Sequence, residues 1–296
     1  MPDDKNKVLI FGFPEEAEKF RQRHPLWVDR FPNIVNAVNT AFTRIQTMES
    51  AADKMVYFYG RMCAEDFMEI LLVCGNGYGA AALKLVRSMY EHAVTLRYLH
   101  EHAEEVENFM LYSRVQQYKL TKPIFETFGR DVLPPETVAR VERQYEEVKE
   151  RFMVTTCDCG AKRVNHTRSK LDFVAMAKKT GALGTLIVPG YYLPLKHSHS
   201  TFGGLTERME IVEGRMGFQT ESQPELADRA LMTAHNCLLN ALEVQKERFN
   251  IPGLEEQLQT CFRNYFEIWK PDSELLKDTG EAAEAAADVP ASVEEA

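Results

Sequence analysis

The amino-acid sequence predicts an all-α protein, an up-and-down helical bundle with peripheral helices and one candidate small β-hairpin. Apolar residues recur at spacings of three and four through most of residues 32–270, and this spacing is typical of amphipathic helices. Glycine- or proline-rich turns interrupt the pattern at 75–79, 134–135 and 252–253, where helices are expected to end or begin. Long helices that are joined by short turns favour an up-and-down bundle.

Residues 1–31 are predicted to form an N-terminal arm and a short helix. Residues 7–13 are apolar and indicate either a short strand or, as we expect, an arm that packs on the body. Pro14 opens a charged helix that stops before Pro25, because proline disfavours helical geometry in the residue ahead of it. A bundle helix is expected from Pro32, where helical spacing sets in at Ile34, Val38, Phe42, Ile45 and Met48.

One bundle domain, residues 32–270, is expected to hold the remaining helices. The charged helix after Pro134 has only a narrow apolar seam, so it should lie outside the core or project as a hairpin arm. We expect a polar loop over 154–166 and a broken helical region before the hairpin at 207–220. The predicted helices cover about 50–74, 79–100, 104–120, 134–152, 169–179, 224–249 and 253–269, with 79–100 and 224–249 central.

The charge of the chain is concentrated at its C-terminal end. The formal net charge is -9, but residues 271–296 hold eight Asp or Glu against the single Lys277. This acidic tail has few large apolar residues and is expected to be disordered. The rest of the chain is close to neutral, so composition neither implies nor excludes RNA as a partner.

The sequence gives no sign of export, of a membrane span or of a bound cofactor. The N-terminus lacks the basic start and apolar run of a secretory signal, and the most apolar long window is broken by charges and glycines. We therefore expect a cytoplasmic protein with reduced thiols. Cys157, Cys159 and His166 are weak zinc-ligand candidates, because one-residue Cys spacing is unusual and no fourth ligand lies close by. A loop with two unconnected thiols is the preferred interpretation.

Two charged residues lie at the edge of the apolar stripe in the helix over 79–100. Arg87 and Glu91 are one helical turn apart on this otherwise core-facing surface. They form either a buried or half-buried ion pair that fixes helix register or part of a polar pocket. In a pocket, Arg87 would hold an anion and Glu91 would act as acid or base. Only the ion-pair hypothesis predicts a large loss of stability in Arg87→Ala.

A second polar cluster contains His197 and His199, before a pair of glycines at 203–204. Histidines two residues apart do not share a helix face, so only one is expected to point inward if the segment is helical. They either mark a helix C-terminus, with Gly203 as the stop, or place His199 against Arg87 and Glu91 across the bundle. The second arrangement would create a His-Glu-Arg site.

The run Arg87-Ser88-x-x-Glu91, followed by a Tyr-rich segment and Ser198-His199, resembles a known group of proteins. It is similar to a widespread bacterial family of uncharacterised helical proteins, catalogued only as a domain of unknown function. The similarity covers roughly residues 50–245. This resemblance implies a helical-bundle fold and no particular activity.

A more distant resemblance is to HEPN-type helical bundles, many of which are ribonucleases that use an Arg followed by a His after four to six residues. The chain contains Arg87-x4-His92, Arg97-x4-His102 and Arg229-x5-His235. The resemblance implies an Arg that stabilises the phosphorane, a His that moves the proton of the 2′-hydroxyl, and a dimer that brings two copies together.

Two functions follow as expectations. The first is a binding or scaffold protein that self-associates as a homodimer, since the narrow-seam helix and the aromatic-rich helices offer surfaces to pair. The alternative is a HEPN-like, metal-independent ribonuclease of a defence or stress-response system. In the alternative, the candidate catalytic residues are Arg87, Glu91, His92 and His199.

Overall fold

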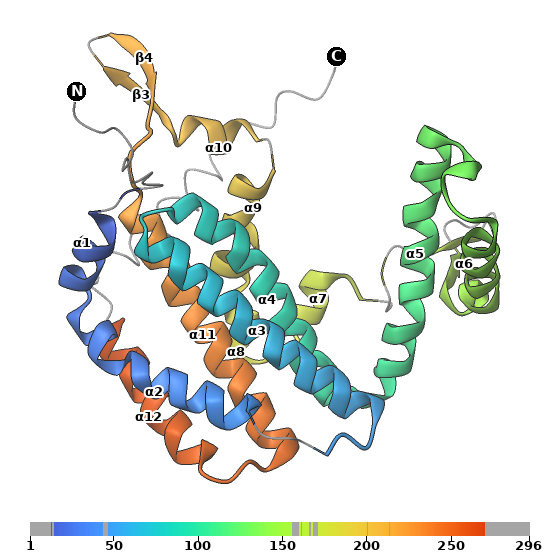
Figure 1. The fold of residues 1–296 in the computed structure, drawn as a ribbon, viewed down its shortest axis with the longest axis horizontal. Helices are drawn as coiled ribbons and strands as arrows, with labels where there is room; N and C mark the ends of the chain where they lie inside the picture. The colour runs from blue at the N-terminus through green and yellow to red at the C-terminus, as the bar shows by residue number, and fades with distance from the viewer. Residues whose placement is uncertain are drawn as a thin grey trace, which may run out of the picture.

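The chain folds as an all-α bundle with two short antiparallel hairpins, which confirms the predicted fold class (Figure 1). Within the part of the chain that the structure describes, no helix is long and apolar enough to cross a membrane. The structure is a computed structural model, and it describes residues 13, 15–43, 47–155, 160, 162–165, 167, 171–199, 201–212 and 214–269.

Three long helices form the centre of the bundle: α3 (Ala51–Gly75), α4 (Gly79–Glu101) and α11 (Pro224–Phe249). Their bounds and the central place of α4 and α11 confirm the prediction. Ser50 opens α3 with a capping box, because its hydroxyl accepts from the Asp53 N–H while the Asp53 carboxylate accepts from the Ser50 N–H. The three helices bury their apolar stripes against one another, and the largest fully buried side chains include Phe67, Tyr90 and Leu238.

A second layer covers this core with α1 (Glu16–Arg23), α2 (Pro25–Phe42) and α12 (Leu254–Ile268). The prediction that the first bundle helix starts at Pro32 is wrong, since α2 starts at Pro25 and continues through Pro32. An interior proline removes one helical hydrogen bond. Burial of Trp27, which is only 2% exposed and belongs to the bundle core, offsets that loss.

An arm projects from the bundle at α5 (Val106–Phe128) and α6 (Pro135–Val148), as the narrow apolar seam predicted (Figure 1). It has a small core of its own, in which Tyr112, Val115, Val148 and Phe152 are buried. α5 is longer than predicted and contains Pro123. The expected loop over 154–166 is partly wrong, because β1 (Met153–Thr155) and β2 (Lys162–Val164) pair there as a hairpin.

The segment between the arm and α11 is a series of short elements, as the broken helical pattern predicted. The predicted helix over 169–179 is reduced to α7 (Phe173–Ala177), because Asp172 caps its N-terminus by accepting from the Ala175 N–H. The predicted hairpin is present as β3 (Met209–Val212) and β4 (Arg215–Phe218). The other elements are α8 (Ala182–Thr185), η5 (Val188–Tyr192), α9 (Leu193–Ser198) and α10 (Phe202–Thr206).

Several predictions concern residues outside the described part of the chain and stay predictions. They are the apolar segment 7–12, the acidic tail 271–296 and the weak zinc candidates Cys157, Cys159 and His166.

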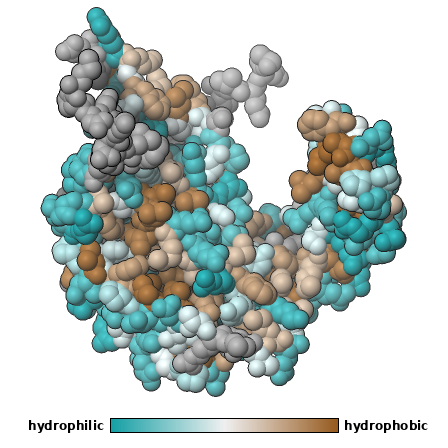
Figure 2. All heavy atoms as spheres, in the orientation of Figure 1, coloured by the Kyte–Doolittle hydropathy of each residue, from teal (hydrophilic) through white to brown (hydrophobic). Residues whose placement is uncertain are grey.

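Apolar side chains gather on the face between α2 and α3 (Figure 2). A groove of about 270 Å³ lies there, lined by residues that include Trp27, Phe31 and Leu72. The same view shows the molecule hollowed between the bundle and the arm of α5 and α6. A larger cleft lies in that second region, at the junction of α3, α5 and α7.

Candidate functional site

Arg87 and Glu91 form an ion pair on α4. The Arg87 Nε donates to the Glu91 Oε1 at 3.1 Å, and the two side chains are 21% and 42% exposed. The pair is therefore half-buried on the Arg side and open to water on the Glu side. An ion pair with this exposure contributes less than about 1 kcal/mol to stability. The ion pair considered from the sequence is therefore present in its half-buried form, and its loss is expected to cost little stability.

His199 meets Arg87 across the bundle, so the His-Glu-Arg arrangement considered from the sequence is present. The Arg87 Nη1 lies 3.1 Å from the His199 Nε2. Because arginine only donates hydrogen bonds, the Nε2 atom must be the acceptor. The lone pair of the His199 Nε2 is therefore directed at Arg87. His199 is the residue that caps the C-terminus of α9, and it is exposed.

Tyr191 fixes the plane of the guanidinium group. The Arg87 Cζ lies 4.7 Å from the centroid of the Tyr191 ring, which is a cation–π contact. The Tyr191 ring also stacks on Phe173, with centroids 4.9 Å apart and an interplanar angle of 29°. Arg87 is thus held by a carboxylate from its own helix and by an aromatic ring and an imidazole from the continuous η5–α9 segment.

Gly190 lets the segment that carries Tyr191 lie directly on α4. A Cβ atom at Gly190 would be 2.7 Å from the Tyr90 ring, so only glycine allows this approach. The Tyr90 hydroxyl donates to the Leu183 carbonyl at 2.8 Å, which ties the same segment to α4 a second time. Burial raises the pKa of Tyr90 and keeps it a neutral donor. These contacts set the positions of Tyr191 and, through α9, of His199.

The guanidinium group of Arg87 keeps donors for an anion. Of its five N–H groups, Nε serves Glu91 and one N–H of Nη1 serves His199. Among the described residues, no other side chain is hydrogen-bonded to Arg87, so both N–H groups of Nη2 and the second one of Nη1 are available. Such a planar fork matches a phosphate or carboxylate group.

His197 does not join this site. Its side chain is 7% exposed and lies 3.4 Å from Glu207, which also contacts Lys196 at 3.0 Å. Burial lowers the pKa of His197. α9 ends at Ser198, which confirms the helix C-terminus, but Gly203 lies within α10 and is not the stop that we predicted.

His92 faces a different partner, although it is on the same helix as Arg87. Its Nδ1 lies 2.7 Å from the Asp66 Oδ2 on α3, and its ring lies 5.8 Å from that of Tyr59. The predicted pair Arg87-x4-His92 is therefore divided between two sets of contacts. The structure groups Arg87 and Glu91 with His199 and places His92 against α3.

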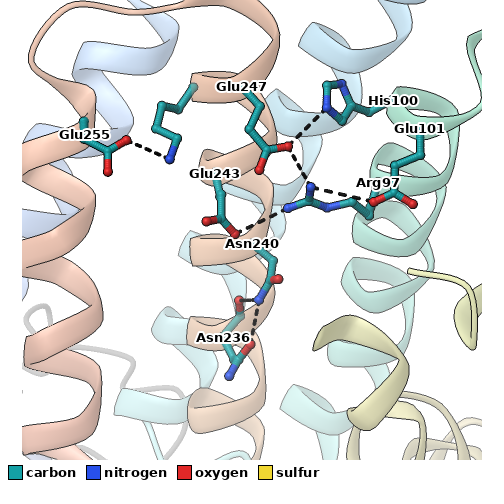
Figure 3. A network of polar contacts seen from close by, with 9 residues as sticks. Arg97, His100, Glu101, Asn236, Asn240, Glu243, Glu247 and Glu255 are labelled. Carbon is teal, nitrogen blue, oxygen red and sulfur yellow. Dashed lines mark hydrogen bonds and ion pairs between the residues drawn. The ribbon is translucent and has the colours of Figure 1, made fainter. Parts of the chain in front are cut away.

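The pair Arg97-x4-His102 is also divided. Figure 3 shows Arg97 reaching from α4 between two carboxylates of α11, with distances of 3.4 Å to Glu243 and 2.7 Å to Glu247. The Arg97 side chain is only 12% exposed. His102 contacts Glu104 at 3.2 Å instead. This network carries no local sequence signal, because its members come from helices far apart in the chain.

His235, the histidine of the third spaced pair, is fully buried in α11. Its Nδ1 accepts from the Trp269 Nε1–H at 3.0 Å. Burial lowers the pKa of His235 to about 3, so the ring is neutral at physiological pH. A group in this position does not reach a macromolecular substrate. In the described part of the chain, no cluster of three His, Cys, Asp or Glu side chains is arranged to hold a metal ion.

Comparison with protein families shows which family the chain belongs to. The family described as a family of unknown function, DUF5677, matches residues 55–216, which is more than half of the chain and includes Arg87, Glu91, Tyr191 and His199. No curated protein matches the chain. No solved structure matches it either.

Proposed function

We propose that this chain, which belongs to the family of unknown function DUF5677, is a cytoplasmic, metal-independent ribonuclease that acts through Arg87 and His199. The observation that supports this proposal is the contact of 3.1 Å between an arginine with unused donors and the Nε2 atom of an exposed histidine. An anion-binding fork beside a proton acceptor is the minimum that RNA cleavage without a metal ion requires. The activity is the one that the HEPN resemblance implied, but with a different histidine.

The chemistry follows from the two side chains. Arg87 would bind the scissile phosphate, and its Nη1 N–H would turn from His199 to a phosphate oxygen. The lone pair that this frees on the His199 Nε2 would then take the proton of the neighbouring 2′-hydroxyl. The 2′-oxygen then forms a bond to phosphorus while the bond to the 5′-oxygen breaks, and that oxygen leaves with a proton from solvent. Arg87 stabilises the charge that builds on the phosphorane. The products are a 2′,3′-cyclic phosphate and a 5′-hydroxyl end.

Glu91 and Tyr191 are positioning residues in this proposal. Glu91 holds the guanidinium group through Nε, which directs the Nη donors toward the substrate. The Tyr191 ring lies against the face of the guanidinium group and fixes its plane. Both contacts restrict rotation of the Arg87 side chain before the phosphate binds. Less conformational entropy is therefore lost on binding.

Replacement of His199 separates this site from the motif expected from the sequence. Loss of a general base lowers a rate by about 100-fold or more. We expect that loss in His199→Gln and near-normal cleavage in His92→Gln, which alters the histidine of the Arg87-x4-His92 pair. The measurement is the initial rate of cleavage of a single-stranded RNA in EDTA. The reverse pattern, with His92 required and His199 dispensable, would assign catalysis to the other pair.

A specific observation also supports part of the first expected function, the self-association of a binding or scaffold protein as a homodimer. The β3–β4 hairpin pairs Ile211 with Met216, and these side chains are 81% and 72% exposed. Met209 and Phe218 form the next pair on the same face. A two-stranded ribbon is only marginally stable unless its apolar face is covered. The same face of a second copy would cover it, as a two-fold axis provides.

Mass measurement in solution tests this proposal. We expect the wild type to be a dimer and the double variant Ile211→Lys, Met216→Lys to be a monomer, because charge on the apolar face opposes its burial. Glu210→Lys, on the opposite face of the ribbon, is the control and should stay dimeric. A monomeric wild type, or a double variant that remains dimeric, would remove the hairpin as the interface.

A further inference from the structure

The cleft between α3, α5 and α7 has the size of a small-molecule site. It encloses about 570 Å³, which is within the range of ligand pockets. α3 contributes Met55 and Tyr59, α5 contributes Phe109 and Tyr112, and the α7 segment contributes Phe173. Each wall of the cleft therefore includes at least one aromatic ring.

The lining is suited to a flat ring with a polar edge. Tyr59 and Phe109 meet edge to face in the lining, with centroids 5.8 Å apart and an interplanar angle of 77°. Met110 and Met176 add polarisable sulfur atoms, which pack well on π-systems. Gln116 also lines the cleft and brings an amide that can pair with the edge of a heteroaromatic ring.

The cleft is joined to the proposed catalytic site by a stack of rings. Phe173 lines the cleft and stacks on Tyr191, and Tyr191 in turn lies under the guanidinium group of Arg87. The ring centroids of Phe173 and Tyr191 are 4.9 Å apart, and the Arg87 Cζ lies 4.7 Å from the Tyr191 centroid. A ligand ring in the cleft and an anion on Arg87 would thus be separated by two stacked side chains, Phe173 and Tyr191.

Positive charge lies beside the cleft as well. The Lys119 ammonium group is 5.6 Å from the centroid of the Tyr112 ring and donates to the Tyr112 hydroxyl at 3.3 Å. A cation next to an aromatic lining is the combination with which proteins hold single-stranded nucleic acids, in which bases stack while lysine or arginine neutralises phosphate.

From this geometry we infer that the cleft binds a nucleobase of the RNA substrate, so that the chain recognises a base away from the bond that it breaks. That the ligand is a base of RNA rests on the proposed ribonuclease function. That the cleft binds a flat heteroaromatic ring rests only on the residues that line it. The two statements can therefore fail independently.

A matched pair of variants tests the inference. Gln116 and Gln117 are neighbouring exposed residues of α5, and of the two only Gln116 lines the cleft. The probe is 2-aminopurine riboside, whose fluorescence is quenched when its base stacks on aromatic rings. We expect quenching by the wild type, a Kd raised at least about 10-fold in Gln116→Trp, which fills the cleft, and a Kd within about two-fold in Gln117→Trp.

A parallel titration with Arg87→Ala distinguishes failure of this inference from failure of the ribonuclease proposal. The nucleoside carries no phosphate, so its binding should be unchanged in Arg87→Ala even though cleavage is lost. Binding of the nucleoside by a protein that cleaves no RNA would leave the cleft inference standing and remove the ribonuclease. No quenching by the wild type, or equal effects of the two tryptophan variants, would overturn the cleft inference whether or not RNA is cleaved.

Discussion

Arg87→Ala is expected to lower the rate of RNA cleavage by about 100- to 1000-fold, the usual effect of removing a group that stabilises transition-state charge. The melting temperature should hardly change, because Glu91 is 42% exposed and is solvated by water once its partner is gone. The measurement pairs initial cleavage rates with thermal unfolding of the same samples. A large loss of activity in a folded protein is the result that a site predicts and that a structural ion pair does not.

Arg61→Ala is the matched control for this experiment. Arg61 and Glu65 form an ion pair with the same spacing on α3, at 3.2 Å, with exposures of 47% and 62%. Its removal should affect neither activity nor stability. Arg87→Lys should recover only part of the activity, since lysine keeps the charge but not the planar fork. If Arg87→Ala unfolds the protein at a much lower temperature, the ion pair is structural after all.

Gly79→Ala is expected to destabilise the fold by about 3 kcal/mol, the upper end of the effect of overpacking a well-filled site. A Cβ atom there would lie 2.4 Å from the Gln223 carbonyl oxygen and 2.7 Å from the Ala227 nitrogen. Both are backbone atoms of the segment where α11 begins, so a side-chain rotation does not relieve the contact. Chemical denaturation measures the change in the free energy of unfolding.

Gly75→Ala is the control for that prediction. Gly75 is the last residue of α3, and a Cβ atom there would meet nothing within 4 Å. Alanine is the better helix former, so this variant should be as stable as the wild type or more stable by up to about 1 kcal/mol. Equal effects of the two substitutions would show that α4 and α11 do not approach each other as closely as described.

Helical periodicity predicted most of the fold because each long helix carries its own apolar stripe and its own end signals. Ser50 at the start of α3 and Pro224 at the start of α11 are examples. The start of α2 was misplaced because Pro32 has the sequence signal of a helix start, whereas the packing of Trp27 makes an interior proline tolerable. Local rules do not include that tertiary contribution.

The site was predictable only in part. The i, i+4 spacing placed Arg87 and Glu91 together, because that contact is within one helix. The meeting with His199 depends on how Gly190 packs on Tyr90 and on where α9 ends, so the sequence offered it as one of two arrangements. His92 was grouped with Arg87 by spacing alone, but residues five apart on a helix point in different directions, and His92 contacts Asp66. The cleft had no sequence signal, since its walls come from three separate helices.

Analysis of the RNA ends left by the wild-type protein in EDTA tests the central claim most directly. A base-catalysed attack by the 2′-hydroxyl at Arg87 and His199 predicts new 2′,3′-cyclic phosphate and 5′-hydroxyl ends, formed without added metal ion. RNA that stays intact at high protein concentration, or cleavage that needs a divalent ion and leaves 3′-hydroxyl ends, would contradict the claim.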